Sequence, residues 1–197
     1  MGEPNSIFSE ILFKTYKKKK IHKFNKPIVV IGSIDLLKSQ MKSLKYFIQI
    51  KKLNNYGLKK LNLNNKSINI IDVKYNFKKS FEKISDKSNK YINNCFKIAL
   101  NLLKNNKSCG LINGPISKTY FLKKKYLGIT EYLAKNTKTN KKPTMLIYNS
   151  SFSVCPITTH LPINQVSKKL TKEKIVNDIR NIEIFYRKRL NKKPKFA

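Results

Sequence analysis

The stretch PIVVIGS, residues 27–33, contains the strongest structural signal in this sequence. Its run of apolar and β-branched residues predicts a buried strand that ends at Gly32. Ser33 is a residue type that favours the N-cap of a helix, so the sequence predicts a helix from there to about Lys45. A buried strand followed directly by a helix is typical of α/β folds.

The rest of the chain alternates between strand and helix patterns in the same way. Apolar residues at helical spacing predict a long helix over residues 81–103, and Ser6 is placed to cap a first helix. Further helices are expected at 117–123, 130–136 and 171–189, and short strands at 47–50, 68–73, 111–112, 145–148 and 152–157. The sequence therefore predicts an α/β protein.

The net charge of +33 raises nucleic acid as a partner. Only Arg180, Arg187 and Arg189 are arginines, although arginine is the better planar reader of phosphates and bases. The lysines are spread along the whole chain among asparagines and isoleucines, the residues that AT-rich codons encode. We interpret the charge mainly as compositional bias and expect no specific nucleic-acid partner. A basic nucleic-acid-binding protein is the alternative hypothesis.

Nothing in the sequence indicates a membrane or a secretory location. No apolar run approaches the roughly 18 residues of a membrane span, and the first residues lack a basic-then-apolar signal pattern. The three cysteines are odd in number and form no CxxC pair, which favours reduced, unpaired thiols. We therefore expect a cytoplasmic protein with no membrane partner.

His160 is the first candidate for chemistry, within ITTHLP at residues 157–162. It follows a predicted strand, and α/β folds bind their ligands at the carboxyl ends of strands. A neutral imidazole at this place would bind a divalent metal ion. A loop histidine bonded to a nearby carbonyl is the alternative, and the spacing alone favours that alternative.

Two predicted helix starts are further candidates. The stretch NGPISK, residues 113–118, is a strand-to-helix turn whose free amides and Lys118 would hold an anion. In GITEYLA, residues 128–134, Thr130 would either cap the helix or hydrogen-bond a ligand. An ordinary capped turn is the alternative interpretation for both. The sequence contains no GxGxxG, GxxxxGK[ST], GxSxG or HExxH motif.

Taken together and in this order, these segments resemble the 4-hydroxythreonine-4-phosphate dehydrogenase family. The family opens with Gly-Asp-Pro-Ala-Gly-Ile-Gly-Pro-Glu, and residues 2–10 match it at Gly2, Pro4, Ile7 and Glu10. The other resemblances are a Pro-Ile-Asn-Lys-like turn at 115–118, a Gly-His-Thr-Glu-Phe/Tyr-Leu-Ala segment at 128–134, and an intact Thr-Thr-His-Leu-Pro segment at 158–162.

The resemblance implies an isocitrate/isopropylmalate dehydrogenase-like fold, of which residues 1–197 would be the amino-terminal portion of two domains. It implies NAD-dependent oxidation and decarboxylation of a small phosphorylated amino acid, 4-phosphooxy-L-threonine, to 3-amino-2-oxopropyl phosphate in vitamin B6 biosynthesis. The family enzymes are homodimers that use NAD and a divalent ion (zinc, magnesium or cobalt). By this resemblance His160 is a metal ligand and Thr130 contacts the substrate, in one concave site with the turn at residues 114–115.

Two departures from the family pattern limit what this chain is expected to do alone. Ile129 stands where the family has a substrate-binding histidine, and isoleucine can neither donate nor accept a hydrogen bond. The family's other two metal-binding histidines, and most of its cofactor site, are expected beyond residue 197. We therefore expect the chain to be catalytically incomplete, and a non-catalytic remnant is an alternative.

Overall fold

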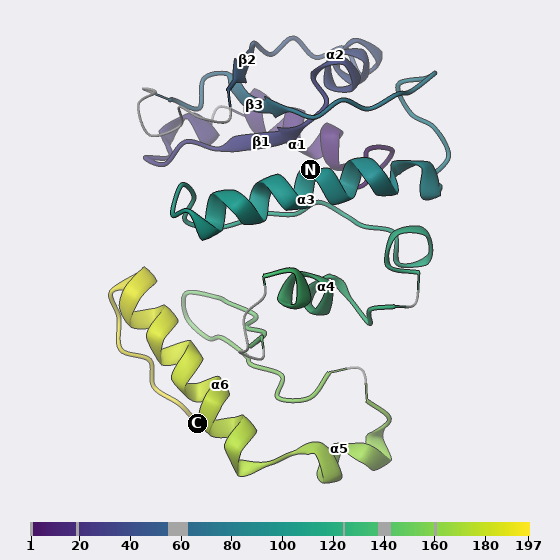
Figure 1. The fold of residues 1–197 in the computed structure, drawn as a ribbon. Coiled ribbons are helices and arrows are strands. Elements are labelled where there is room, and N and C mark those ends of the chain that lie inside the picture. Colours follow the sequence, from purple (N-terminus) through teal and green to yellow (C-terminus); the bar gives the residue numbers. More distant parts are fainter. Residues whose placement is uncertain (1, 19, 55–62, 124, 138–142, 160) are drawn as a thin grey trace. The chain divides into compact units, whose positions relative to one another are not determined.

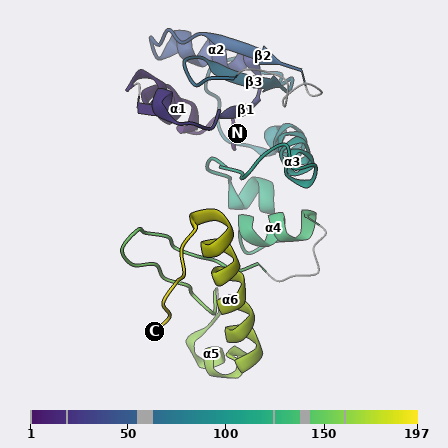
Figure 2. The same ribbon diagram turned by 90° about the vertical axis from the view of Figure 1, so that its left-hand side faces the viewer.

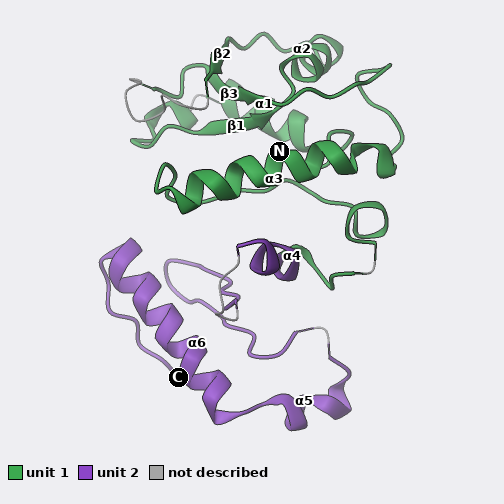
Figure 3. Ribbon diagram, viewed as in Figure 1, with its two compact units in different colours: residues 1–129 green, residues 130–197 purple. Residues whose placement is uncertain are grey.

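The protein forms two compact units, shown in Figure 3. The computed structural model describes residues 2–18, 20–54, 63–123, 125–137, 143–159 and 161–197. Unit 1 spans Met1–Ile129 and unit 2 spans Thr130–Ala197. Among the described residues, no helix is long and apolar enough to cross a membrane.

Unit 1 is built on a parallel sheet of three strands (Figure 1). The strands are β1 (Val29–Gly32), β2 (Ile50–Leu53) and β3 (Ile68–Asp72), and β3 lies between the other two. Both β1 and β2 run parallel to β3. The three isoleucines of β3 are buried, as expected for a central parallel strand that is covered on both faces. The predicted α/β class is confirmed.

Three helices cover the sheet. Helices α1 (Phe8–Lys17) and α2 (Ile34–Ser43) pack on one face, and α3 (Asn89–Lys104) lies on the other side of the sheet from α2 (Figure 1, Figure 2). Burial of apolar side chains between these layers is the main stabilising term of the unit. The buried cluster between α1, α2 and the strands contains Phe13, Tyr16, Ile21, Val30, Leu37, Met41, Ile68 and Ile70.

The predicted strand-to-helix turn at the end of β1 is confirmed in detail. Ser33 is the N-cap of α2, and its Oγ accepts a hydrogen bond from the backbone N–H of Leu36 at 3.2 Å. A side-chain oxygen at this position satisfies an N–H group that has no partner within the helix. The sequence signal therefore fixes where β1 stops and α2 begins.

Three predictions in unit 1 are wrong in part. The N-cap of α1 is Ile7, without a side-chain bond, and not Ser6. The Ser6 hydroxyl donates to the Glu3 carbonyl, although its Oγ also accepts from the N–H of Phe8, the first residue of α1, at 3.3 Å. The strand expected at 47–50 lies at Ile50–Leu53, and Phe47 is exposed. The helix expected from residue 81 begins at Asn89, after a short 3-10 turn at Asp86–Ser88.

The strand predicted at residues 111–112 is absent from the structure. Ile112 is exposed, and these residues have no strand partner among the described residues. Two apolar residues in a row are too weak a signal for a strand, since a strand needs a neighbour to satisfy its backbone groups. The shorter elements of unit 1 are a 3-10 turn at Lys20–Lys23 and a π-helical turn at Lys118–Leu122.

Unit 2 contains helices α4 (Ile129–Asn136, whose first residue ends unit 1), α5 (Ile163–Lys169) and α6 (Lys172–Phe185). A π-helical turn, Tyr186–Leu190, follows α6 directly. The helices α4 and α6 confirm the predictions for 130–136 and 171–189, with Thr171 as the N-cap of α6.

The two strands predicted at 145–148 and 152–157 are not formed as strands. One antiparallel bridge joins Ile147 to Val154, and the residues between them make a hairpin-like turn. Side-chain contacts to α6 and to the π-helical turn after it hold this hairpin instead of a sheet. Thr144 Oγ1 donates to Asp178 Oδ1 at 2.6 Å, and the Tyr186 hydroxyl donates to Ser153 Oγ at 2.9 Å.

Candidate active site

The carboxyl ends of β1 and β3 are occupied by the protein's own polar groups. The backbone N–H of Ile34 donates to Asp72 Oδ1 at 3.1 Å, and that of Ser33 donates to the Tyr91 hydroxyl at 3.1 Å. Lys52 Nζ lies 3.5 Å from Asp72 Oδ2. A phosphate at the start of α2 would need these amides and would meet the Asp72 carboxylate. This turn is therefore not built as a dinucleotide site, consistent with the missing GxGxxG motif.

Tyr91 is buried beside this turn, with 4% of its surface exposed. Its ring lies 4.8 Å from that of Tyr75, centroid to centroid. Burial raises the pKa of Tyr91 well above its usual value, and burial also raises the pKa of the Cys95 thiol. Both groups therefore keep their protons at neutral pH, and we assign them a structural role.

The segment Gly2–Asn5, at the start of the family-like motif, is buried against this region. Glu3 is 2% exposed, and both of its carboxylate oxygens accept from the Ser88 hydroxyl, at 2.9 and 3.1 Å. Asn5 Nδ2 donates to the Tyr75 hydroxyl at 3.4 Å. A segment that makes no helix or strand of its own is thus fixed by side-chain contacts.

The turn at residues 113–118 lies directly against this segment. The backbone N–H of Glu3 donates to the Pro115 carbonyl at 2.8 Å. A Cβ atom added to Gly2 would lie 2.3 Å from that carbonyl oxygen, and one added to Gly114 would lie 2.7 Å from the ring of Phe8. Both positions therefore require glycine because no side chain fits between the two segments.

The structure favours the capped-turn interpretation of residues 113–118 over the anion site. The π-helical turn that follows has only five residues, Lys118–Leu122. Ser117 Oγ accepts from the Tyr120 N–H at 3.1 Å, and the Ser117 carbonyl accepts from the Phe121 N–H. The Tyr120 amide at the start of this turn is thus bonded to Ser117, as in an ordinary capped turn.

The two candidates in α4 lie in its first turn. Ile129 is the first residue of α4 and Thr130 the second, so Thr130 is not the N-cap, contrary to the capping alternative. Both side chains are half-buried. The role of Thr130 as a substrate contact stays a prediction.

His160 lies outside the described residues, so its predicted role as a metal ligand stays a prediction. Residues 155–159 and 161–162, on either side of it, form neither helix nor strand. In the described part of the chain, no three His, Cys, Asp or Glu side chains come close enough to hold a metal ion. Those residues by themselves therefore do not fit a metal site. The predicted concave site stays untested, because Thr130 belongs to unit 2 and the turn at 114–115 to unit 1.

Comparison with known proteins identifies the family. Residues 23–197 match the family model described as Pyridoxal phosphate biosynthetic protein PdxA. The chain belongs to this family. The expected resemblance to 4-hydroxythreonine-4-phosphate dehydrogenases is therefore confirmed.

Two curated members of the PdxA family show how far the likeness extends. The chain is 32% identical over 204 residues to the 4-hydroxythreonine-4-phosphate dehydrogenase of Sulfurihydrogenibium sp. (strain YO3AOP1), covering 100% of this chain and 60% of that enzyme. It is 36% identical over 75 residues to the enzyme of the same name from Aquifex aeolicus (strain VF5), covering 37% of this chain and 23% of that enzyme. The chain thus spans about 60% of the length of the first relative.

Solved structures of PdxA enzymes have the same fold. The 4-hydroxythreonine-4-phosphate dehydrogenase of Klebsiella pneumoniae superposes with a TM-score of 0.77 at 20% identity, over 95% of this chain and 57% of that chain. The enzyme of Burkholderia phymatum gives a TM-score of 0.79 at 20% identity, over 93% and 55%. At this identity the likeness establishes the mixed α/β fold with its parallel sheet.

The sequence did not predict the contacts of the segment Gly2–Asn5. The segment Gly2–Asn5 was compared with the family motif, but no contact was expected between Glu3 and Ser88 or between Gly2 and Pro115. The available signal was the pair of glycines, Gly2 and Gly114, each in a family-like segment. Small residues in two separate segments indicate close backbone approach, but they do not identify the partner.

Proposed function

We propose that residues 1–197 are the amino-terminal portion of a 4-hydroxythreonine-4-phosphate dehydrogenase that acts in vitamin B6 biosynthesis. The reaction is oxidation of the secondary alcohol of 4-phosphooxy-L-threonine, with hydride transfer to NAD. The resulting β-keto acid loses carbon dioxide and gives 3-amino-2-oxopropyl phosphate. The observation that supports this most is the 32% identity to the Sulfurihydrogenibium enzyme across the entire chain.

The residues of this chain would contribute substrate and metal contacts. The Thr130 hydroxyl would hydrogen-bond the substrate, and Ile129 beside it would contribute only apolar contact. His160 would be one ligand of a divalent ion (zinc, magnesium or cobalt). From the family resemblance, we propose that the other ligands and most of the NAD site lie outside residues 1–197, in an isocitrate/isopropylmalate dehydrogenase-like second part.

We also propose that the working enzyme is a homodimer. The hairpin of unit 2 presents apolar side chains to solvent: Ile147 is 61% exposed and Phe152 76% exposed. Exposed apolar groups gathered on one hairpin are typical of a surface that another chain covers. Light scattering would test the homodimer by comparing the molar mass of a chimera, which joins residues 1–197 to the remaining part of the Sulfurihydrogenibium enzyme, with that of its Phe152→Ser variant. A monomeric chimera would contradict the proposal.

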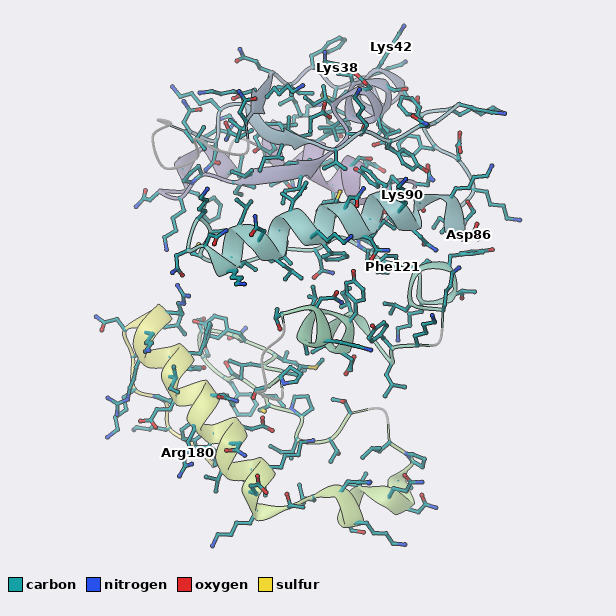
Figure 4. All side chains as sticks on the ribbon, viewed as in Figure 1. Lys38, Lys42, Asp86, Lys90, Phe121 and Arg180 are labelled. Carbon is teal, nitrogen blue, oxygen red and sulfur yellow. The ribbon has the colours of Figure 1, made fainter. Side chains whose placement is uncertain are left out.

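We propose that the enzyme is cytoplasmic and has no specific nucleic-acid partner. Basic side chains are distributed over separate elements of both units, as Lys38 and Lys42 on α2, Lys90 on α3 and Arg180 on α6 illustrate in Figure 4. Basic side chains spread in this way attract polyanions without regard to sequence, in a manner that salt weakens, and do not select one nucleic-acid sequence.

A chimera tests the dehydrogenase function directly. Residues 1–197 would be joined to the part of the Sulfurihydrogenibium enzyme that the chain does not cover. The purified chimera would receive NAD, a divalent metal ion and 4-phosphooxy-L-threonine, and NADH absorbance would be followed. We expect steady NADH formation because the chain would supply Thr130 and His160 to an otherwise complete enzyme.

The control is the same chimera with His160→Ala. Loss of NADH formation in this variant, with an unchanged circular dichroism spectrum, would support a role for His160 in the reaction. A folded chimera that forms no NADH would contradict the proposed function. Activity that is equal in the two chimeras would contradict the assignment of His160.

A further inference from the structure

The segment Gly2–Asn5 is buried although it forms no helix or strand. Gly2, Glu3 and Pro4 are all buried, whereas irregular segments normally run over the surface because water satisfies their backbone groups there. Here the protein itself supplies the partners. We call this segment the strap.

Three separate elements of unit 1 hold the strap. From the start of α3, Ser88 donates to the Glu3 carboxylate. From α2, Gln40 Nε2 donates to the Pro4 carbonyl at 2.8 Å. The loop after β3 contributes the Tyr75 hydroxyl, which accepts from Asn5 Nδ2, and the backbone N–H of Glu82, which donates to Asn5 Oδ1 at 3.1 Å.

The strap also contacts the turn at residues 113–115. One backbone hydrogen bond, from the Glu3 N–H to the Pro115 carbonyl, joins them at 2.8 Å. The backbones approach so closely that a Cβ atom on Gly2 would overlap the Pro115 carbonyl oxygen. On the turn itself, Gly114 lies against the ring of Phe8, at the start of α1. The turn is thus held between the strap and α1.

The Glu3 carboxylate is the part of this arrangement that is hardest to explain as ordinary packing. A buried carboxylate is unfavourable unless donors satisfy it. Its donors are the Ser88 hydroxyl and the backbone and side-chain amides of Asn5, and no salt bridge to it occurs among the described residues. An apolar residue would fill the same space, but it would make no directional bond to the start of α3.

We propose that the strap is a positioning device for the turn at residues 113–117, with Glu3 as its positioning residue. Glu3 links the start of α3, through its side chain, to the turn, through its backbone. The turn therefore takes its place relative to the sheet from the strap. Loosening the strap frees the turn and the π-helical turn after it while the sheet stays intact.

Hydrogen exchange measured by mass spectrometry tests the strap, with glycine substitutions as probes. Gly2→Ala introduces a Cβ atom against the Pro115 carbonyl, and Gly110→Ala is the matched control because nothing lies within 4 Å of a Cβ atom there. We expect exchange of the amides of residues 113–122 to rise about tenfold in Gly2→Ala. Exchange in β1 and β3, and throughout Gly110→Ala, stays at the wild-type rate.

Ser88→Ala provides a second probe that adds no atoms, in case Gly2→Ala does not fold. It removes the hydroxyl donor from the Glu3 carboxylate, so the same rise is expected in residues 113–122. Wild-type exchange of these residues in a folded Ser88→Ala protein would overturn the proposal, as would equal loss of protection in the sheet. Because exchange is measured without catalysis, the result is independent of the proposed dehydrogenase activity.

Discussion

The hydroxyl of Ser88 donates to the carboxylate of Glu3 at 2.9 Å, although 85 positions separate the two residues. Glu3 lies before α1, and Ser88 is the residue that precedes α3. The bond therefore joins the first segment of the chain to the helix on the other side of the sheet from α2. It also supplies a hydrogen-bond donor to a side chain that is almost completely buried.

Glu3→Ala is expected to lower the free energy of unfolding by about 1–3 kcal/mol, because Ser88 and the Asn5 amides lose a buried acceptor. The matched control is Glu10→Ala, which removes a carboxylate that forms a more exposed i,i+4 pair with Lys14. Such a pair contributes at most about 1 kcal/mol. Urea denaturation of both variants checks this, and equal losses would show that burial of Glu3 has no special weight.

Alkaline pH is expected to destabilise the fold through Tyr91. Its folded-state pKa is raised by burial, so its contribution is complete below the unfolded value of roughly 10 and is lost as the pH rises above it. Above that pH, the free energy of unfolding should fall with pH in the wild-type protein and in Tyr91→Phe, but less steeply in the variant. The two slopes should differ by roughly 1.4 kcal/mol per pH unit. Denaturation at several pH values between neutral and alkaline tests this.

The exposed Tyr120 provides the control for this effect. Tyr120→Phe should retain the wild-type dependence on pH, since this side chain, unlike that of Tyr91, is exposed. Tyr91→Phe is also expected to be less stable at neutral pH, because the buried N–H of Ser33 loses its acceptor. Identical slopes for the two variants would contradict the assignment to Tyr91.

In unit 2, Asp178 on α6 is expected to stabilise the hairpin before it. This buried carboxylate accepts from Thr144 Oγ1, which in turn accepts from Asn181 Nδ2 at 2.9 Å. Asp178→Ala should therefore increase proteolysis between residues 143 and 154, whereas Asn177→Ala, at the exposed neighbouring position, should not. An unchanged cleavage rate in Asp178→Ala would show that the hairpin is held by other contacts.

Local signals predicted the sheet and helices of unit 1 well. The PIVVIGS stretch gave both β1 and the Ser33 cap because the strand end and the helix start depend on neighbouring residues. The predictions failed where the decisive contact is distant in sequence. The apolar pattern at 145–157 predicts two strands. The structure instead forms a single bridge between Ile147 and Val154, and Asp178 of α6 accepts a hydrogen bond from Thr144 just before it.

The candidate site shows the same division. The sequence proposes Ile129, Thr130 and His160 as site residues, and these three assignments stay predictions. The strap was not predicted, because its bonds join Glu3 to Ser88 and to Pro115 across most of unit 1. Nothing in the local pattern around Glu3 distinguishes a buried carboxylate from a solvated one.

Ile129→His is expected to restore a polar contact to the substrate in the active chimera. A histidine at this position would hydrogen-bond the substrate, which Ile129 cannot do. We expect KM for 4-phosphooxy-L-threonine to fall about tenfold, with a smaller change in kcat, since one net hydrogen bond contributes about 1 kcal/mol or somewhat more. Thr130→Val should raise KM. An unchanged KM in Ile129→His would show that the position does not face the substrate.

A polypeptide of residues 1–197 alone is expected to have no dehydrogenase activity. A catalytic metal ion usually takes about three protein ligands, and His160 is the one credible candidate in this sequence. Hydride transfer also requires the nicotinamide to be held against the carbinol carbon, and the start of α2 is occupied by Asp72 and Ser33. Correct orientation lowers a barrier by roughly 7 to 11 kcal/mol in favourable cases, so its loss abolishes turnover.

The measurement is NADH absorbance with the purified polypeptide, NAD, a divalent metal ion and 4-phosphooxy-L-threonine. The positive control adds, as a separate polypeptide, the part of the Sulfurihydrogenibium enzyme that the chain does not cover. Activity only in the mixture would support a site divided between the two parts, because each then supplies ligands that the other lacks. Steady turnover by residues 1–197 alone, lost in His160→Ala, would show that this portion already contains every group that the reaction needs.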